Sequence, residues 1–251
     1  MRKIGFLITA RMKSTRLPKK LTLKIMNREI IAWLIDRLKQ SDILDEIIIA
    51  TSTNPQDDIL CNIAERENIK FYRGSEDDVI ERLYQAAKHF ELEYILQITA
   101  DCPLVSFDFF DKVVENYKET KADLITTFKL PHGFFLYGLK LSALKKVIEI
   151  KDDSDTEVWG RYFTETNIFK VKDIDIPKKF QRNNYRLSLD YQEDYDFFKA
   201  VYNGLGPKTY EKTTLEIIEF LDNHPEIVKI NEHCEDIYKE RLEKQAKLKL
   251  K

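Results

Sequence analysis

Length, composition and charge narrow the class of protein before any motif is considered. The chain has 251 residues and a formal net charge of −2, from 41 basic and 43 acidic side chains. A hydrophobic share of 43% with 33% charged residues is typical of a globular protein and excludes an extensively disordered chain. The near balance of charge argues against a duplex nucleic-acid partner, because domains that bind one are usually strongly basic.

The cysteines and the first residues indicate in which cellular compartment the protein is found. Three cysteines, an odd number without paired spacing, are more typical of a reducing cytoplasm than of a disulfide framework. The first apolar run is only about six residues long, which is too short for a signal-peptide core or a membrane span. We therefore expect a cytoplasmic protein that does not span a membrane.

Short apolar runs alternate with segments of helical periodicity through the first half of the chain. This alternation predicts consecutive strand–helix units, and hence an α/β fold with a mostly parallel central sheet and helices on both faces. The expected strands are 3–9, 46–51, 70–73, 94–99 and 123–127, and the helices between them are 29–40, 56–67, 77–89 and 107–119.

The second half of the chain is less regular. We interpret 130–177, which is rich in aromatic side chains, as an insertion that covers the acceptor side of a site or forms a dimer seam. A strand at 185–189 and a helix at 192–202 then complete a single domain over 1–238. The basic end, 239–251, is expected to form a helical tail, more simply explained as a solvated helix end than as a binding surface.

A cationic loop follows the first expected strand. Residues 9–21, TARMKSTRLPKKL, carry five lysines and arginines and no glycine. Ligands of open α/β sheets bind outside the carboxyl ends of the strands, and arginine and lysine are the side chains that bind phosphate there. The loop therefore predicts a polyphosphate site, with a merely solvated turn as the alternative.

Two aspartates follow other expected strands. Asp101 lies in LQITADCPL and Asp190 lies in YRLSLDYQED. Because the carboxyl ends of parallel strands meet at one edge of a sheet, we expect both to approach the cationic loop. Mg²⁺ binds through one or two carboxylates together with substrate phosphates. This arrangement predicts metal-assisted nucleotidyl transfer, and the alternative is that each aspartate caps a turn or a helix.

These motifs resemble those of a known family. The run ARMKSTRLPKKL resembles the signature loop of the cytidylyltransferases that activate acidic sugars, the CMP-Kdo and CMP-sialic acid synthetases. YRGSEDDVIERL from Tyr72, LQITADCPLV from Leu96 and LSLDYQEDYDFF from Leu187 are closer still to the spore-coat polysaccharide biosynthesis branch. The likeness covers most of residues 1–203, with four separated motifs in the same order.

The resemblance implies a Rossmann-like nucleotide-diphospho-sugar transferase fold, CTP as the donor and Mg²⁺ as the cofactor. It implies that Arg11, Lys20, Asp101 and Asp190 are catalytic, with the two aspartates as metal ligands. The residues implied for nucleotide binding are Ala10, Arg11, Ser14, Arg16 and Lys20 around the triphosphate, and Arg73, Ser75 and Gln97 around the base and ribose.

The acceptor side is less well defined by the resemblance. The Gly-Asp-Glu-Pro of the Kdo branch is Ala100-Asp101-Cys102-Pro103 here, which keeps the aspartate but leaves the acceptor open. Comparison with the spore-coat branch implies that His132, Glu157 and Arg161 lie on the acceptor side. The alternatives are a turn role for His132 and a simple i,i+4 ion pair between Glu157 and Arg161.

The sequence thus predicts an enzyme that transfers CMP from CTP to a sugar acid, sugar phosphate or polyol phosphate and releases pyrophosphate, in the synthesis of surface polysaccharides or glycoconjugates. One alternative is a nucleotide-sugar-dependent glycosyltransferase of the same general fold, although residues 100–103 lack the Asp-x-Asp that such enzymes commonly use. The other is a non-catalytic nucleotide-sensing module. Many relatives are dimers, so we expect a homodimer.

Overall fold

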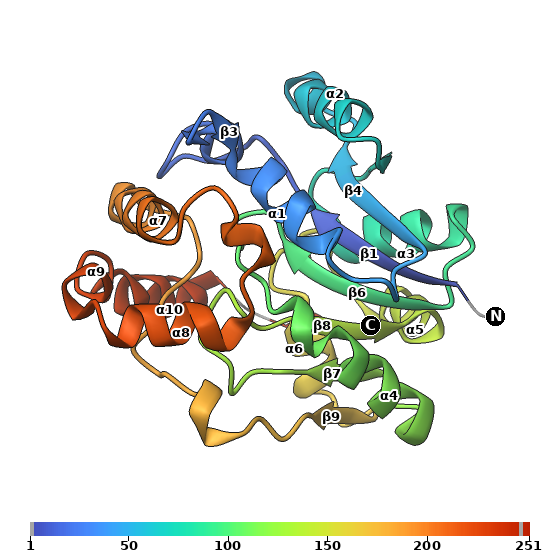
Figure 1. Ribbon diagram of the computed structural model, residues 1–251. Coiled ribbons are helices and arrows are strands. Elements are labelled where there is room, and N and C mark those ends of the chain that lie inside the picture. Colours follow the sequence, from blue (N-terminus) through green and yellow to red (C-terminus); the bar gives the residue numbers. More distant parts are fainter. Residues whose placement is uncertain (1–2, 246–247) are drawn as a thin grey trace.

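The computed structural model describes residues 3–245 and 248–251, and its centre is a seven-stranded sheet (Figure 1). The strand order is β5-β4-β1-β6-β8-β7-β9. The strands are β1 Ile4–Thr9, β4 Glu46–Ser52, β5 Lys70–Gly74, β6 Tyr94–Thr99, β7 Leu124–Thr126, β8 Tyr137–Lys140 and β9 Val171–Asp173. Neighbouring strands are parallel except where β8 pairs with β6 and β7. The predicted, mostly parallel sheet is confirmed.

Helices cover both faces of this sheet, as predicted. They are α1 Ile30–Leu38, α2 Asp58–Arg66, α3 Val79–His89, α4 Phe110–Thr120, α5 Leu141–Ile150, α6 Gly160–Thr164, α7 Gln192–Leu205, α8 Thr214–Asp222, α9 Pro225–Val228 and α10 Cys234–Gln245. Apolar side chains of α1, α2 and α4 pack in one cluster on one face, and those of α3, α5 and α6 pack in a second cluster on the other. In Figure 1, α1 and α4 lie in front of the sheet and α3 and α5 behind it.

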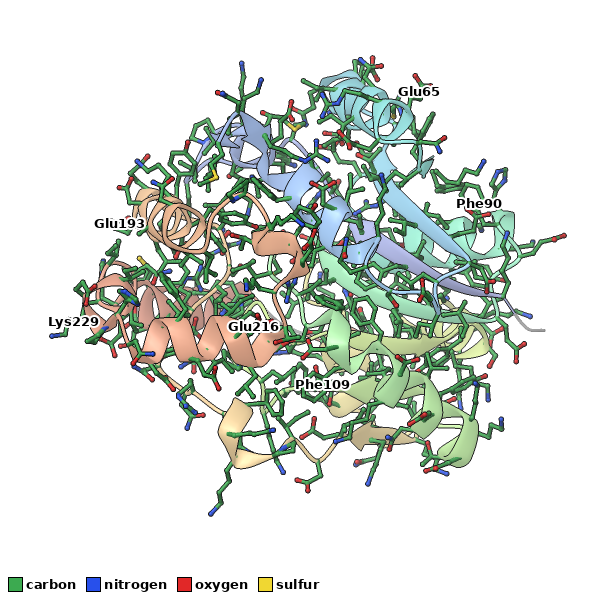
Figure 2. All side chains as sticks on the ribbon, viewed as in Figure 1. Glu65, Phe90, Phe109, Glu193, Glu216 and Lys229 are labelled. Atoms are coloured by element: carbon green, nitrogen blue, oxygen red, sulfur yellow. The ribbon has the colours of Figure 1, made fainter. Side chains whose placement is uncertain are left out.

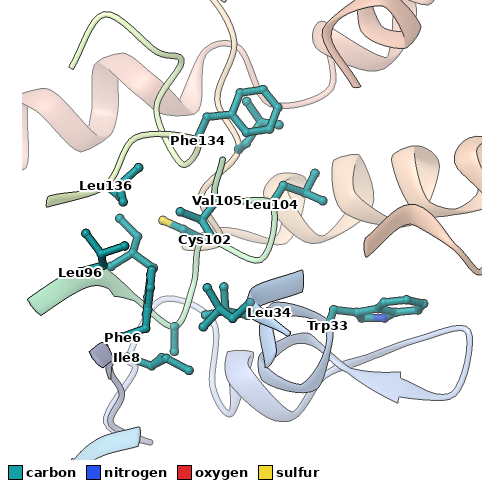
Figure 3. Packing of buried hydrophobic residues seen from close by; sticks show 14 of the residues in the cluster. Phe6, Ile8, Trp33, Leu34, Leu96, Cys102, Leu104, Val105, Phe134 and Leu136 are labelled. Atoms are coloured by element: carbon teal, nitrogen blue, oxygen red, sulfur yellow. The ribbon is translucent and has the colours of Figure 1, made fainter. Parts of the chain in front are cut away.

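The first strand shows why the sheet is buried on both faces. Side chains alternate between the two faces of a strand, so Phe6 and Ile8 enter the first cluster and Leu7 enters the second. Figure 3 shows Phe6 and Ile8 near Leu34 of α1, with Leu96 of β6 beside them. All of these side chains are fully buried, and each contributes roughly 1.5–3 kcal/mol through removal of apolar surface from water.

The outer surface of the helices is charged. Glu65 of α2, Glu193 of α7 and Lys229 just after α9 are exposed and project away from the core (Figure 2). Within the part of the chain that the structure describes, no helix has the length and apolar character needed to cross a membrane.

Segment 130–177 takes part in the central sheet. It contributes β8 between β6 and β7, and β9 at the edge next to β7. The close packing here needs Gly138, because a Cβ at this position would lie 2.1 Å from the Tyr94 hydroxyl. The segment also supplies the loop before α6, which reaches the carboxyl ends of the parallel strands.

The expected strand at 185–189 is wrong. The structure has an extended segment with a single bridge, between Arg186 and His132. Its amides bond to loops, because Leu187 N donates to the His132 carbonyl (2.7 Å) and Leu189 N donates to the Asp101 carbonyl (2.9 Å). Alternating apolar residues correctly indicated burial, but this segment runs across the loops at the carboxyl end of the sheet and not alongside a strand.

Four helices, α7 to α10, gather beyond the carboxyl ends of the strands, on the left in Figure 1. The buried Arg37 of α1 joins this group to the sheet, since its guanidinium donates to the carbonyls of Val105 (2.6 Å) and Lys212 (2.7 Å). Residues 239–245 continue α10, which begins at Cys234 and ends at Gln245. Close to the chain end, Leu250 forms an antiparallel bridge with Lys151.

Candidate active site

A cavity of about 550 Å³ lies at the carboxyl ends of β1 and β6, under α10 and the loop before α6. Most of the predicted site residues line it. They are Arg11, Ser14, Arg16, Lys20, Gln97, Asp101, His132, Glu157, Arg161 and Asp190. Residues from distant parts of the chain therefore share one cavity, as the parallel-strand argument required.

The centre of the cavity is an ammonium group held by two carboxylates. Lys20 Nζ donates to Asp101 Oδ2 (2.5 Å) and to Asp190 Oδ1 (2.9 Å), and Arg16 Nη2 donates to the same Asp190 oxygen (2.5 Å). Lys20 is presented by a 3₁₀ turn, Lys20–Thr22, that follows Lys19 in the left-handed conformation (φ 57°). The segment that carries Asp190 is joined to Asp101 through the bond from the Leu189 amide to the Asp101 carbonyl described above.

Lys20 and Asp190, at the centre of this cluster, are both charged at neutral pH. Burial alone would lower the pKa of Lys20, but the attraction of Asp101 and Asp190 outweighs it and raises that pKa above its ordinary value. Burial alone would raise the pKa of Asp190, but Lys20, Arg16 and Arg186 together hold it well below its ordinary value. The cluster is therefore a compact array of paired full charges, most of it shielded from solvent.

Behind Asp190 lies a fully buried arginine. Arg186 donates to Asp190 Oδ2 (3.0 Å), Asp194 Oδ1 (2.9 Å) and Glu235 Oε2 (3.0 Å). Asp194 also accepts from the backbone amides of Asp190 (2.8 Å) and Tyr191 (3.0 Å), so it caps α7. Sequence reasoning missed Arg186 and Glu235. One signal was available for Arg186, a cation inside the otherwise apolar run YRLSL.

Two further predicted residues lie on the other side of the cavity. Arg11 donates to the Glu76 carbonyl (2.7 Å) and lies within ion-pair distance of Asp77 (3.6 Å) and Glu157 (3.7 Å). Gln97 donates from Nε2 to the Thr9 hydroxyl (3.0 Å), while its buried Oε1 has no partner among the described residues. A buried acceptor without a donor is costly, and here it belongs to a side chain that lines the cavity.

Three predicted nucleotide contacts are absent from the described cavity lining. Ala10 is buried at the end of β1. The Arg73 guanidinium bonds to the carbonyls of Ser52 and Asn54 and pairs with Asp58 (2.7 Å). The Ser75 hydroxyl accepts from the Asp78 amide (3.1 Å). Arg73 and Ser75 therefore bond to nearby residues of the chain, and the base and ribose contacts expected of them stay predictions.

The predicted acceptor residues all line the cavity, and its more exposed part around Glu157, Arg161 and Arg241 is called the outer end. His132 Nδ1 lies 2.7 Å from Glu235 Oε2, and its ring stands between Phe135 and Tyr238. The suggested i,i+4 pair of Glu157 with Arg161 is wrong, because Arg161 pairs with Glu165 (3.3 Å). Glu157 lies before α6 rather than inside it, which explains the difference.

Helix α10 also lines this end of the cavity, through Tyr238, Arg241 and Leu242. Arg241 Nη2 lies 3.5 Å from Glu157 Oε1, so α10 and the loop before α6 meet across the cavity. The expectation of a merely solvated helix end is wrong at Arg241 and Leu242. The sequence offered no signal for this, because α10 is polar on most sides and lacks a clear apolar face.

The two aspartates are suitable donors for a divalent cation. Within 3–245 and 248–251, no group of three or more acidic, histidine or cysteine side chains is arranged to hold a metal by protein ligands alone. Asp101 and Asp190 nonetheless meet at one ammonium, so their carboxylates are close neighbours. A pair of carboxylates completed by substrate phosphates is the donor set that Mg²⁺ prefers.

A cationic loop and paired carboxylates at the carboxyl edge of a parallel sheet are features of nucleotidyltransferases. The sequence pattern of one such family, the cytidylyltransferases, matches residues 6–248. The chain belongs to the cytidylyltransferase family. The predicted family and its activity, transfer of a cytidylyl group, are thereby confirmed, and the glycosyltransferase alternative is not supported.

Individual proteins agree with this assignment. An uncharacterized protein of Methanocaldococcus jannaschii is 32% identical over 91% of this chain and 94% of its own length. The spore coat polysaccharide biosynthesis protein SpsF of Bacillus subtilis is 27% identical over 90% of this chain and 97% of its own. A solved cytidylyltransferase from Leptospira borgpetersenii superposes with a TM-score of 0.82 at 28% identity, covering 91% of this chain and 97% of that one.

Proposed function

We propose that this enzyme uses Mg²⁺ and CTP to transfer CMP to an acidic or phosphorylated sugar-like acceptor, with release of pyrophosphate, for surface polysaccharide or glycoconjugate synthesis. The observation that carries the proposal is the contact of Lys20 with both Asp101 and Asp190. It brings a phosphate-binding cation and two metal-binding carboxylates to one point. In the reaction, an acceptor oxygen bonds to the α-phosphorus of CTP as the bond from that phosphorus to pyrophosphate breaks.

The cations that now pair with carboxylates would pair with phosphates when CTP binds. Lys20 and Arg16 contact Asp190, and Arg11 lies near Asp77 and Glu157. A triphosphate brings enough negative charge to replace these acidic partners, and arginine binds phosphate through two parallel hydrogen bonds. Ser14 lies in the same loop and lines the cavity, so its hydroxyl can add a hydrogen bond to phosphate.

Asp101 and Asp190 would hold the Mg²⁺ ion. Once released from Lys20 by the incoming phosphates, their carboxylates offer oxygen ligands on the inner side of the cavity. When bound, Mg²⁺ supplies positive charge that stabilises the reacting phosphates and orients them. Arg186 keeps Asp190 in place through its second oxygen, so this carboxylate needs little reorganisation.

Gln97 supports cytosine as the base. Its unpartnered Oε1 lines the cavity and is an acceptor for a hydrogen bond, which the exocyclic amino group of cytosine would donate. Uracil has a carbonyl at that position and would leave the buried oxygen without a donor, at a cost in binding. Discrimination by this side chain therefore favours CTP over UTP.

The outer end of the cavity suits an anionic acceptor. Arg161 and Arg241 line it together with His132, next to the aromatic wall of Phe135 and Trp159. Arginine side chains bind carboxylate and phosphate, while aromatic rings pack against the apolar faces of sugars. This combination favours a sugar acid or a phosphorylated sugar or polyol.

The enzyme is further proposed to work in the cytoplasm as a homodimer. Cys61, Cys102 and Cys234 are all free and buried, as expected in a reducing compartment. The edge strand β9 carries the exposed Val171, and the exposed Ile168 precedes it closely. An open edge with apolar side chains favours pairing with a second copy. Light scattering after gel filtration tests this, since a single species of about 30 kDa would contradict it.

A pyrophosphate-release screen tests the catalytic proposal. The protein is incubated with each nucleoside triphosphate, with and without Mg²⁺, against a panel of acidic sugars and phosphorylated polyols. We expect release only with CTP, Mg²⁺ and one class of acceptor. Absence of CTP binding by calorimetry in the presence of Mg²⁺, for a protein that is folded, would contradict the proposal.

A further inference from the structure

His132 and Glu235 form a hydrogen-bonded pair in the cavity wall that the account of phosphate binding does not use. Nδ1 of His132 lies 2.7 Å from Oε2 of Glu235, and both side chains are largely shielded, with 13% and 15% exposure. The pair joins two parts of the chain that are 103 residues apart. Such a pair needs an explanation, because it fixes an imidazole in a site where a reacting group must bind.

The imidazole is held firmly in place. His132 precedes Gly133, which has a positive φ of 94° and lies so close to Leu187 that a Cβ would be 2.0 Å from its carbonyl oxygen. The His132 carbonyl accepts from the Leu187 amide. The ring centroid lies 5.5 Å from that of Phe135 and 4.7 Å from that of Tyr238. Backbone and ring contacts therefore fix both the position and the plane of the imidazole.

The groups around His132 determine which ring nitrogen carries the proton. Burial alone would raise the pKa of Glu235, but His132 and Arg186 lower it below its ordinary value, so Glu235 is a carboxylate at neutral pH. A carboxylate only accepts, so the 2.7 Å contact places the N–H on Nδ1. The Arg186 guanidinium, 3.3 Å from Nδ1, also donates to Glu235. Burial raises the pKa of Tyr238, which stays neutral.

The second ring nitrogen is consequently available. In the neutral imidazole with its proton on Nδ1, Nε2 carries the lone pair, and among the described residues it has no hydrogen-bond partner. His132 lines the cavity that also contains Asp190. One guanidinium, that of Arg186, contacts both His132 and Asp190, so the histidine lies close to the proposed metal ligands without touching them.

We propose that His132 is the general base of the reaction and that Glu235 is its positioning residue, an inference that rests on the proposed function. Nε2 takes the proton from an acceptor hydroxyl as the oxygen forms its bond to the α-phosphorus. The electron pair of the broken phosphorus–oxygen bond leaves with pyrophosphate, and the proton passes from His132 to solvent. A phosphate or carboxylate oxygen is already ionised at neutral pH and needs no base. The acceptor therefore reacts through a hydroxyl, as a sugar acid does.

The experiment compares His132→Asn with the wild type. Asparagine keeps an amide donor near the position of Nδ1 and removes Nε2, and His89→Gln, at an exposed histidine far from the cavity, is the matched control. The acceptor probes are 3-deoxy-manno-octulosonate and N-acetylneuraminate, which react through a hydroxyl, and glycerol 3-phosphate, which reacts through phosphate. Pyrophosphate release is followed between about pH 5.5 and 9, a range that brackets histidine titration.

We expect release with a hydroxyl acceptor and a wild-type rate that rises with pH and then levels off. His132→Asn should lower kcat on the order of 10²–10⁴-fold and abolish this rise. Its CTP affinity by calorimetry should stay within about threefold, because the histidine does not touch the phosphates. The control should match the wild type. Glu235→Gln should lower kcat on the order of 10-fold or more and move the rising limb to lower pH, and Glu235→Asp should restore part of the rate.

Several outcomes would overturn the inference and leave the proposed function standing. These are full activity of His132→Asn with an unchanged pH profile, or turnover with glycerol 3-phosphate alone. If His132→Asn does not fold, His132→Gln takes its place, and the pH profile of Glu235→Gln gives an independent result. An unshifted profile there contradicts a positioning role. The proposed function fails separately, if the folded wild type neither binds CTP nor releases pyrophosphate with any probe.

Discussion

The two ends of the cavity are built differently. At the inner end, Lys20 and Arg16 contact Asp190 at 2.9 and 2.5 Å, and the Asp190 side chain is only 5% exposed. At the outer end, Glu157 is 52% exposed and lies 3.7 Å from Arg11 and 3.5 Å from Arg241. Short, buried ion pairs hold one arrangement, whereas long, hydrated pairs are weak and easily replaced.

This difference fits the tasks of the two ends. The inner end must present the same charged side chains to every triphosphate. Its ion pairs keep these side chains in place until, as proposed above, phosphates bind the cations and a metal ion binds the carboxylates. The outer end must admit an acceptor and release a larger product, which loosely paired side chains permit. Variants at the inner end should therefore affect turnover or folding strongly, and variants at the outer end should affect acceptor binding modestly.

The largest effect is expected at Asp101. Asp101→Asn removes a carboxylate that binds Lys20, and turnover should fall on the order of 10³-fold because the charge array around the reacting phosphates is lost. Lys20 keeps Asp190 as a partner, so the free energy of unfolding should fall by only about 1–2 kcal/mol. Mg²⁺-dependent pyrophosphate release and urea unfolding measure both. Asp196→Asn, at a half-buried aspartate of α7 that pairs with Lys199, is the control, and a fully active Asp101→Asn would remove Asp101 from the mechanism.

The largest loss of stability is expected from substitution of Arg186, which lies next to the inner end. Arg186→Met leaves Asp190, Asp194 and Glu235 facing one another without the buried cation, and the free energy of unfolding should fall by roughly 3–5 kcal/mol. Arg182→Met is the matched control nearby, where an exposed pair with Asp222 is lost at a cost below about 1 kcal/mol. Equal destabilisation by the two variants, in denaturant unfolding, would contradict the contrast between buried and exposed pairs.

The stability contributed by Glu235 should depend on pH. Its pKa is lower in the folded than in the unfolded protein, so the stabilisation is complete above the unfolded pKa of about 4.3 and is lost as pH falls below it. Glu235→Gln should therefore destabilise the protein near pH 7 but hardly change it near pH 3. Thermal unfolding of both proteins at the two pH values measures this, and a constant difference would show that the charge of Glu235 is irrelevant.

A modest effect is expected at the outer end. Arg241→Met removes a cation that lines the acceptor end, so KM for the acceptor should rise about threefold to tenfold with little change in KM for CTP. Lys118→Met, at an exposed lysine of α4 outside the described cavity lining, is the control. An equal rise in KM for CTP would show that Arg241 contacts the nucleotide, and would contradict the distinction between an inner and an outer end of the cavity.

The smallest effect is expected at Arg73, which the resemblance placed at the nucleotide and the structure places outside the described cavity lining. Arg73→Lys should change KM for CTP by no more than about twofold, since among the described residues the guanidinium bonds to Ser52, Asn54 and Asp58 alone. Initial rates at varied CTP concentration measure this. A tenfold increase would show that Arg73 moves into the cavity when the nucleotide binds.

Sequence reasoning located the inner end well because it depends on local patterns. Each of Lys20, Asp101 and Asp190 follows an apolar segment, and the rule that parallel strands share a carboxyl edge brings them together. The position of Asp190 was predicted correctly even though its segment is not a strand. Leu187 and Leu189 are buried and bond to loops at the carboxyl edge of the sheet, which places Asp190 at that edge.

The outer end was harder to predict because its residues meet only through tertiary packing. Glu235 and Arg241 belong to a helix with few apolar side chains, and their spacing does not indicate that this helix crosses a cavity. Arg73 shows the converse problem. The resemblance to the family predicted that Arg73 contacts the nucleotide. In the structure its guanidinium donates to the carbonyls of Ser52, at the end of β4, and Asn54, in the loop that follows.

The pairing of the final residues with the end of α5 has a practical consequence. Leu250 bridges Lys151, and the Lys249 ammonium lies 2.8 Å from Asp153, at the start of the loop that leads to Glu157. A purification tag fused after Lys251 would thus put a load on the loop that leads to Glu157. Protein for enzymology should carry its affinity handle at the amino end, and assays on carboxyl-tagged protein should be interpreted with that load in mind.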